Sequence, residues 1–225
     1  MLTVHHLENS RSQRILWLLE ELGVDYAIER YARDPETKLA PPELQQVHPL
    51  GKAPIVVDGD TTVAESGAII EYLLERFDDG ALRPAPGTAE GRAFTYWLHY
   101  AEGSYMPLMI LSLVIRRIET APMPFFAKPV ARGIADKVRK GYLDANVRRH
   151  TDYLEQHLSG SEWFCGERFS GADIQMSFAI EAAEVRTDLA GHYPRLAGFL
   201  RKIRARPAYA RALERGGPYE LMGGG

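Results

Sequence analysis

Cysteine is almost absent from this sequence, with Cys165 the one residue of its kind in 225. A single thiol excludes an internal disulfide framework and a metal centre built from several thiolates. The apolar neighbours Trp163 and Phe164 predict a buried small side chain at Cys165 rather than a redox nucleophile. Long apolar runs are also missing, and no charged leader followed by an apolar stretch opens the chain. We therefore expect a soluble, cytoplasmic protein without a membrane partner.

An excess of charge of one sign is likewise missing. The 27 Lys and Arg residues nearly balance the 30 Asp and Glu residues, which gives a net charge of −3 and a pI near 6.2. We therefore expect no nucleic-acid partner, and the basic run 201–206 is typical of a solvated helix face. The seven histidines show no metal-ligand spacing, and we expect no bound metal.

Residues 1–79 alternate between short apolar stretches and amphipathic ones, a pattern typical of an α/β domain. The first strand–helix–strand unit predicts a parallel pair with a right-handed crossover. The short turn Asp58-Gly59-Asp60 predicts an antiparallel hairpin for the last two strands. The expected strands are 2–7, 26–31, 55–57 and 61–64, and the expected helices are 12–23, 42–47 and 66–77.

Prolines and glycines in 80–88 predict a linker, and the pattern after it is helical throughout. Pro107 predicts a kink or a break, because proline has no amide hydrogen to donate within a helix. Ser170 and Asp173 form a capping pair before an apolar helix. We expect the tail at 223–225 to be disordered. The expected helices of this second, all-α domain are 89–119, 124–158, 172–189, 193–205 and 207–215.

Two features of the first domain point to a bound peptide-like ligand. Pro54 opens an apolar strand, and a cis bond there would free the backbone of the preceding residue to pair with a ligand. Glu65 and Ser66 begin a helix, where exposed N–H groups and the dipole favour a bound carboxylate. An extended peptide with a free carboxylate at each end, such as glutathione, fits both features.

A polar loop, 8–14, joins the first expected strand to the first expected helix. A hydroxyl near that helix N-terminus can donate a hydrogen bond to a sulfur and stabilise its thiolate. Thiols titrate near pH 8.5, and lowering that pKa by about two units places most of the sulfur in its nucleophilic form at neutral pH. Ser10 and Ser12 are the candidates, and the alternative is that either serine simply caps the helix.

Four segments resemble motifs of the cytosolic glutathione S-transferase family and follow one another in the family's order. The resemblance implies a thioredoxin-like glutathione-binding domain over 1–79, a linker over 80–88 and an all-helical domain over 89–225. It also implies glutathione as the co-substrate, a small hydrophobic electrophile and a homodimer. The segments are Asn9-Ser10-Arg11-Ser12-Gln13-Arg14, Pro49-Leu50-Gly51-Lys52-Ala53-Pro54, Glu65-Ser66-Gly67-Ala68-Ile69 and Phe169-Ser170-Gly171-Ala172-Asp173-Ile174.

The resemblance also implies a role for each matched residue. Pro54 corresponds to the family's cis-proline, and the backbone of Ala53 would pair with the cysteinyl part of glutathione. Glu65 and Ser66 would bind the γ-glutamyl amine and carboxylate. A basic residue would lie near the glycyl carboxylate. Lys52 is the main candidate for this role, and Lys38 is a weaker one.

The loop departs from the best-known types in the family, because it contains neither tyrosine nor cysteine. By analogy with the serine-type transferases, Ser10 is the default residue for activating the thiol. Asn9 is its rival, because a shift of one residue would bring the Asn9 amide to the sulfur. Arg11 and Arg14 would supply positive charge, and Arg14 is equally suited to pair with a carboxylate between the domains.

The first helix of the second domain is expected to face the loop and to line the electrophile pocket through Tyr105, Met106 and Met109. The same region is expected to offer apolar surface for a homodimer through Phe94, Trp97, Leu98 and Tyr105. The function this predicts is a glutathione transferase. Two alternatives remain at this point: a glutathione-dependent peroxidase or disulfide reductase, and a non-catalytic binding module of the same fold.

Overall fold

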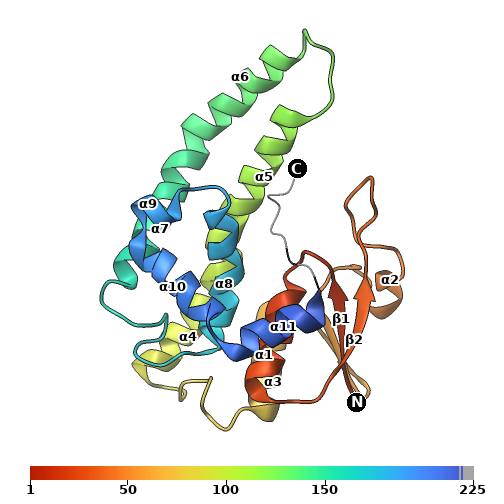
Figure 1. Ribbon diagram of the computed structural model, residues 1–225, viewed down its shortest axis with the longest axis vertical. Helices are drawn as coiled ribbons and strands as arrows, with labels where there is room; N and C mark the ends of the chain where they lie inside the picture. The colour runs from red at the N-terminus through yellow and green to blue at the C-terminus, as the bar shows by residue number, and fades with distance from the viewer. Residues whose placement is uncertain (218, 220–225) are drawn as a thin grey trace.

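The computed structural model describes residues 1–217 and 219. The predicted disorder at 223–225 lies outside the described residues. The chain forms a sheet-containing part and a helical part that pack against each other (Figure 1). Residues 78–88, which connect the two parts, contain no helix or strand.

The first part is a four-stranded sheet with helices, in the order that the sequence predicts. The strand order is β2-β1-β3-β4, with β1 parallel to β2, and with β3 antiparallel to both β1 and β4. Helix α1 packs on β1 through a fully buried apolar face, and it ends at Gly23, whose φ of +65° suits glycine. The elements are β1 Leu2–Leu7, α1 Ser12–Leu22, β2 Ala27–Tyr31, α2 Leu44–Val47, β3 Ile55–Asp58, β4 Thr61–Ala64 and α3 Ser66–Phe77.

The second part is helical, but its first helices are not the uninterrupted ones that the sequence predicts. A π-helical turn, η1, separates α4 from α5, and a second one, η2, separates α6 from α7. The expected helix 124–158 begins only at Lys128, and the expected helix 172–189 ends at Glu184. The elements are α4 Ala89–Tyr100, η1 Ala101–Tyr105, α5 Met106–Thr120, α6 Lys128–Val138, η2 Arg139–Leu143, α7 Asp144–His157, α8 Gly171–Glu184, α9 Leu189–His192, α10 Pro194–Arg204 and α11 Pro207–Gly216.

The irregularity predicted at Pro107 takes the form of η1. The Met106 N–H donates to the carbonyl of Ala101, five residues back, and Pro107 then lies in the first turn of α5. A proline is tolerated there because the amide hydrogens of a first turn need no partner within the helix. The chain therefore changes its helical pitch just before the proline and continues as a helix.

Helix α8 is the centre of the helical part. All of its residues from Gly171 to Ala183 are buried, and the predicted capping pair is confirmed. Asp173 accepts hydrogen bonds from the Ser170 N–H at 2.8 Å and from the Phe164 N–H at 2.9 Å. These bonds satisfy the start of a helix that has no access to water.

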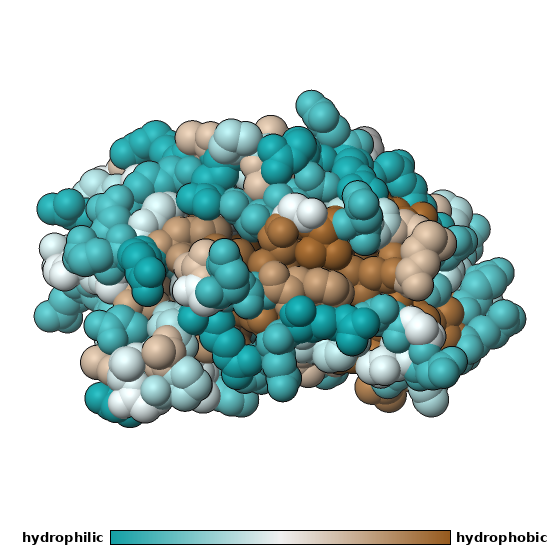
Figure 2. Space-filling view, turned by 90° about the horizontal axis from the view of Figure 1, so that it is seen from below, coloured by the Kyte–Doolittle hydropathy of each residue, from teal (hydrophilic) through white to brown (hydrophobic). Residues whose placement is uncertain are grey.

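The apolar residues expected to form a dimer surface lie instead in the core of one chain. Their side chains pack against α8 and its neighbours, and their exposed fractions are therefore at most 4%. These residues are Phe94, Trp97, Leu98 and Tyr105. Several exposed apolar side chains lie instead on the long α5–α6 pair that projects from the molecule (Figure 1). Apolar side chains also gather in the middle of the lower face, inside a polar rim (Figure 2).

Across residues 1–217 and 219, no helix has the length and apolar character needed to cross a membrane.

Candidate active site

Four loops meet at one end of the sheet. Strands β1 and β2 end side by side, with Leu7 opposite Tyr31. His5 lies opposite Ile55, the first residue of β3, and Ile55 lies opposite Ala64, the last residue of β4. The loops after β1, β2 and β4 and the loop before β3 therefore leave the sheet at the same end. Every candidate glutathione-binding residue predicted from the sequence lies in these loops or at the helix ends next to them.

The loop after β1, residues 8–11, is called the Asn9 loop below. Asn9 adopts a φ of +50° and is half-buried. The guanidinium of Arg33 donates to the carbonyl oxygens of Glu8 at 3.1 Å, of Asn9 at 3.0 Å and of Lys38 at 2.9 Å. A single side chain from the loop after β2 therefore fixes the backbone of the Asn9 loop and ties it to the segment that carries Lys38.

The start of α3 has the geometry of an anion site. Glu65 lies between β4 and α3 with a φ of +71°, which is unusual for a residue with a side chain. Ser66 is the first residue of this twelve-residue helix and is 3% exposed. The first amide hydrogens of a helix have no partner within it, and the helix dipole adds a positive field there. A carboxylate is the natural ligand for such a position.

The other predicted glutathione-binding residues surround the same end of the sheet. The Ala53–Pro54 peptide bond is cis, as the resemblance implied. Gly51, just before it, is buried with a φ of +55°, and a Cβ atom there would lie 2.7 Å from Gln45. The side chains of Lys52 and Lys38 are exposed, in the loop before β3 and the loop after β2.

The hydroxyl of Ser10 points into the protein. It is 2.7 Å from the Ser12 hydroxyl, and its oxygen accepts from the Ser12 N–H at 3.2 Å. The Ser12 hydroxyl is in turn 2.8 Å from Nδ1 of His6, and Nε2 of His6 is 3.1 Å from the carbonyl of Gly216. The Ser10 oxygen therefore satisfies the N–H of the first residue of α1, and Ser10 also belongs to a buried series of hydrogen bonds.

The two arginines of the first motif pair with one carboxylate. Arg14 is 3% exposed and donates to Glu102 and to the Gln175 carbonyl, the latter at 2.7 Å. Nε of Arg11 is 3.2 Å from Glu102. Burial of Glu102 opposes its ionisation, but the two guanidinium groups outweigh it and hold the pKa of this carboxyl below its usual value. Of the two roles expected for Arg14, the structure shows the pairing between the domains.

Tyr105, Met106 and Met109, predicted to line an electrophile pocket, lie in the core. Their exposed fractions are 0%, 2% and 0%, and the Tyr105 hydroxyl is 3.0 Å from that of Thr151. A side chain that lines an open pocket is accessible, so their burial gives the pocket assignment no support. They pack inward because this face of the α4–α5 region covers α8 rather than the loop.

Several residues of the site were not found by sequence reasoning. His6 shares the buried face of β1 with Val4, and a polar residue at an inward position of a strand is a signal that could have been followed. Glu102 lies in the π-helical turn η1, next to Arg11 and Arg14, and no sequence pattern predicted that turn. Arg33 carries no sequence signal for its role.

Comparison with protein-family models gives two matches that follow the two parts of the structure. Residues 1–75 match the model described as the N-terminal domain of glutathione S-transferase, and residues 123–215 match the model of its C-terminal domain. Both the thioredoxin-like sheet domain and its helical partner are therefore those of one class of protein.

Relatives support the same conclusion over nearly the whole chain. Glutathione S-transferase 3 of Schizosaccharomyces pombe is 36% identical, with 96% of this chain and 88% of the relative covered. Glutathione S-transferase 1 of Saccharomyces cerevisiae is 34% identical, with 96% and 95% covered. The crystal structure of a glutathione S-transferase from Actinobacillus pleuropneumoniae is 34% identical with a TM-score of 0.80, covering 99% of this chain and 95% of that one. This chain belongs to the glutathione S-transferase family, as the resemblance implied.

Proposed function

We propose that this glutathione transferase holds glutathione across the end of the sheet, with its thiol at the Asn9 loop. The observation that carries this proposal is the meeting of four loops at one end of the sheet, set by the pairing of His5, Ile55 and Ala64. The γ-glutamyl group binds at Glu65 and Ser66, the cysteinyl part pairs with the backbone of Ala53, and the glycyl carboxylate lies near Lys52, with Lys38 as a weaker partner. Solved structures of glutathione transferases in complex with glutathione share this fold.

The chemistry is attack of the glutathione thiolate on an electrophilic carbon. The sulfur loses its proton to solvent, a carbon–sulfur bond forms and the leaving group departs with its electron pair. The enzyme contributes by lowering the pKa of the thiol and by holding the two reactants together. One charge-assisted hydrogen bond, at roughly 1.5–3 kcal/mol, lowers that pKa by about one to two units. The substrate is a small hydrophobic electrophile.

Transfer of glutathione to an aryl halide tests the proposal. We expect saturable turnover by the purified protein. At saturating glutathione, kcat/KM for the halide should rise with pH until the thiol of bound glutathione is ionised. The matched control is the same protein with a glutathione analogue in which serine replaces cysteine. This analogue lacks the sulfur and is expected to inhibit competitively. A protein that neither turns over the halide nor binds millimolar glutathione would instead be a partner-binding module.

We further propose a cytoplasmic homodimer that pairs through the α5–α6 face. On α5, Ile110, Val114 and Ile118 recur at the spacing of one helix face and are 42%, 44% and 39% exposed. On α6, Val130 and Ile134 are 64% and 56% exposed. Exposed apolar side chains at this density on two packed helices are typical of a protein–protein interface. The single buried thiol suits a reducing compartment.

A further inference from the structure

Hydrogen bonds lead from the Asn9 loop to a histidine buried beneath it. The chain runs from Ser10 through Ser12 to His6, with separations of 2.7 Å and 2.8 Å, and ends at the Gly216 carbonyl 3.1 Å further on. The exposed fractions of the three side chains are 6%, 0% and 3%. Water therefore cannot replace any of these partners.

The direction of every hydrogen bond in this series is set by its last acceptor, the Gly216 carbonyl. A carbonyl oxygen can only accept, and Nε2 of His6 therefore carries a proton to face Gly216. In a neutral imidazole Nδ1 is then an acceptor, which takes the proton of the Ser12 hydroxyl. The Leu7 carbonyl, 3.1 Å from that hydroxyl, is the competing acceptor, but choosing it would leave Nδ1 buried without a donor. The proton between the two serines consequently belongs to Ser10.

Several neighbours act on the charge of His6. Burial is the main cause that lowers its pKa from 6.5 to about 4, and Arg30, its partner across the β1–β2 pair, acts in the same direction, whereas the Gly216 carbonyl and Glu8 act in the opposite direction. A helix C-terminus favours a charged histidine, but burial outweighs it here. At neutral pH the imidazole is neutral, as the direction of the chain requires.

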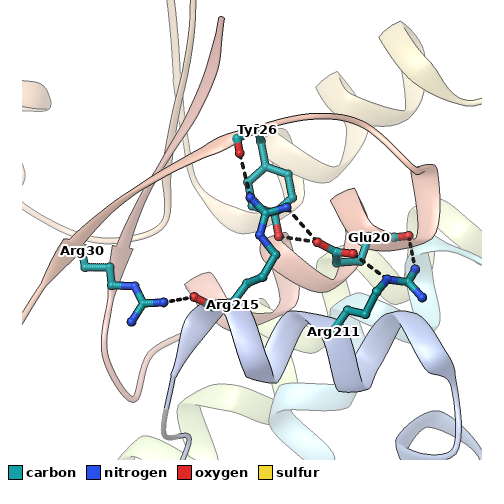
Figure 3. Close-up of polar contacts among 5 residues, drawn as sticks. All are labelled: Glu20, Tyr26, Arg30, Arg211 and Arg215. Carbon is teal, nitrogen blue, oxygen red and sulfur yellow. Dashed lines mark hydrogen bonds and ion pairs between the residues drawn. The ribbon is translucent and has the colours of Figure 1, made fainter.

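The C-terminal end of α11 is held firmly enough to serve as the fixed end of the chain. Arg215 donates to the Tyr26 carbonyl at 2.8 Å and to Glu20 at 3.0 Å, and Arg211 also pairs with Glu20 at 2.8 Å (Figure 3). Arg30 donates to the Arg215 carbonyl, next to the carbonyl that His6 binds. The last carbonyls of a helix have no partner within it, and β1 and β2 supply those partners.

Two roles for His6 are compatible with this geometry, and the size of its pKa shift decides between them. As a base it would collect the thiol proton through the serines, but a group that titrates near 4 lies about four units below a free thiol, a disadvantage of roughly 10⁴-fold. As an acceptor it only orients the hydroxyls. The second role needs no proton transfer.

We propose that His6 is a positioning residue which, through Ser12, keeps the hydroxyl proton of Ser10 turned inward and leaves Asn9 to donate to the glutathione thiolate. This rests on the proposed function above. With its proton committed to Ser12, the inward-pointing hydroxyl of Ser10 has no donor left for a thiolate. The Asn9 side chain ends in an amide with two N–H donors, on a backbone that Arg33 holds at 3.0 Å.

Nuclear magnetic resonance of the unmodified protein tests the first half of the proposal. With nitrogen-15 in the histidine rings and His6→Gln as the assignment control, we expect a neutral ring protonated at Nε2, with shifts that stay constant through the neutral range. A ring protonated at Nδ1, or a charged ring at neutral pH, would overturn the proposal. This measurement needs no ligand, and the His6→Gln variant is used only to assign the ring signals, so its activity does not matter.

The second half is tested by the pKa of the bound thiol, read from the ultraviolet absorbance of the thiolate. We expect Asn9→Ala to raise this pKa by about one unit, a tenfold loss of thiolate, and Ser10→Ala to change it by less than half as much. In the Ser12→Ala background the Ser10 proton is released, and Ser10→Ala should then raise the pKa by about one unit. A merely structural Ser10 would have the same effect in both backgrounds. A dominant effect of Ser10→Ala in the unmodified background overturns the proposal.

Calorimetric titration of glutathione into the unmodified protein and each variant separates the positioning role of His6 from the proposed function on which it rests. If the unmodified protein fails to bind glutathione, the proposed function is wrong, and the ring measurement still decides the state of His6. If glutathione binds and Ser10 controls the pKa of its thiol, only the positioning role of His6 is wrong.

Discussion

Cys165 shows at the scale of one residue how burial removes a side chain from chemistry. It lies next to Phe164 and is 5% exposed, in the core between α7 and α8. Burial raises the pKa of its thiol to about 12, although a hydrogen bond with Ser170 acts in the opposite direction. The sulfur that reacts in this protein therefore has to come from glutathione.

We expect Cys165 to be inert to thiol reagents in the folded protein. A thiol with a pKa about five units above neutrality is ionised to roughly one part in 10⁵, and the thiolate is the reactive form. Labelling with iodoacetamide should be negligible in buffer and should reach one equivalent in urea. Rapid labelling of the native protein would show that this part of the core is open.

At the scale of elements, the capping pair at the start of α8 places a carboxyl group in a fully buried position. Asp173 accepts from two backbone amides and from the Ser170 hydroxyl, at 2.8–2.9 Å. Burial nevertheless dominates and raises its pKa from 3.8 to about 6, with the hydrogen bonds acting against the shift. The folded state therefore prefers the protonated form more than the unfolded chain does.

This gives a pH dependence with a definite sign. The contribution of a group whose pKa is raised on folding is largest below its unfolded pKa, and it is lost as pH rises through about 6. A shift of this size corresponds to about 2–3 kcal/mol. We expect the difference in unfolding free energy between the unmodified protein and Asp173→Asn to shrink by this amount from about pH 4 to pH 7. Urea unfolding at several pH values measures it, and a constant difference would contradict the assignment.

In the sheet domain, the order of elements and the directions of the β1–β2 and β3–β4 pairs could be predicted, because they follow from local apolar patterns, a crossover and a short turn. The antiparallel β1–β3 pairing was not predicted. The capping pair was equally local, since Ser170 and Asp173 are three residues apart. Other features depend on distant partners: His6 binds a carbonyl 210 residues away. The burial of Tyr105 and Met109 depends on how α4, α5 and α8 pack, and an apolar stripe does not reveal which surface will cover it.

At the scale of the whole molecule, the exposed apolar side chains of the α5–α6 face are the basis for the proposed homodimer. The introduction of a charge into an apolar interface costs several kcal/mol when the charge is left unpaired. We expect Ile134→Asp to be monomeric in light scattering at concentrations where the unmodified protein is a dimer. Ala145→Asp, at an exposed position in the first turn of α7, is the matched control and should remain a dimer. A monomeric unmodified protein would contradict the proposal.

The central claim is that glutathione binds at the end of the sheet, with its γ-glutamyl carboxylate at the start of α3. Calorimetric titration of glutathione into the unmodified protein, Ser66→Ala and the exposed control Ser159→Ala tests this most directly. Loss of one hydrogen bond to a charged group predicts about a tenfold weaker affinity for Ser66→Ala and no change for Ser159→Ala. Equal affinities in all three proteins would place the carboxylate elsewhere and contradict the account.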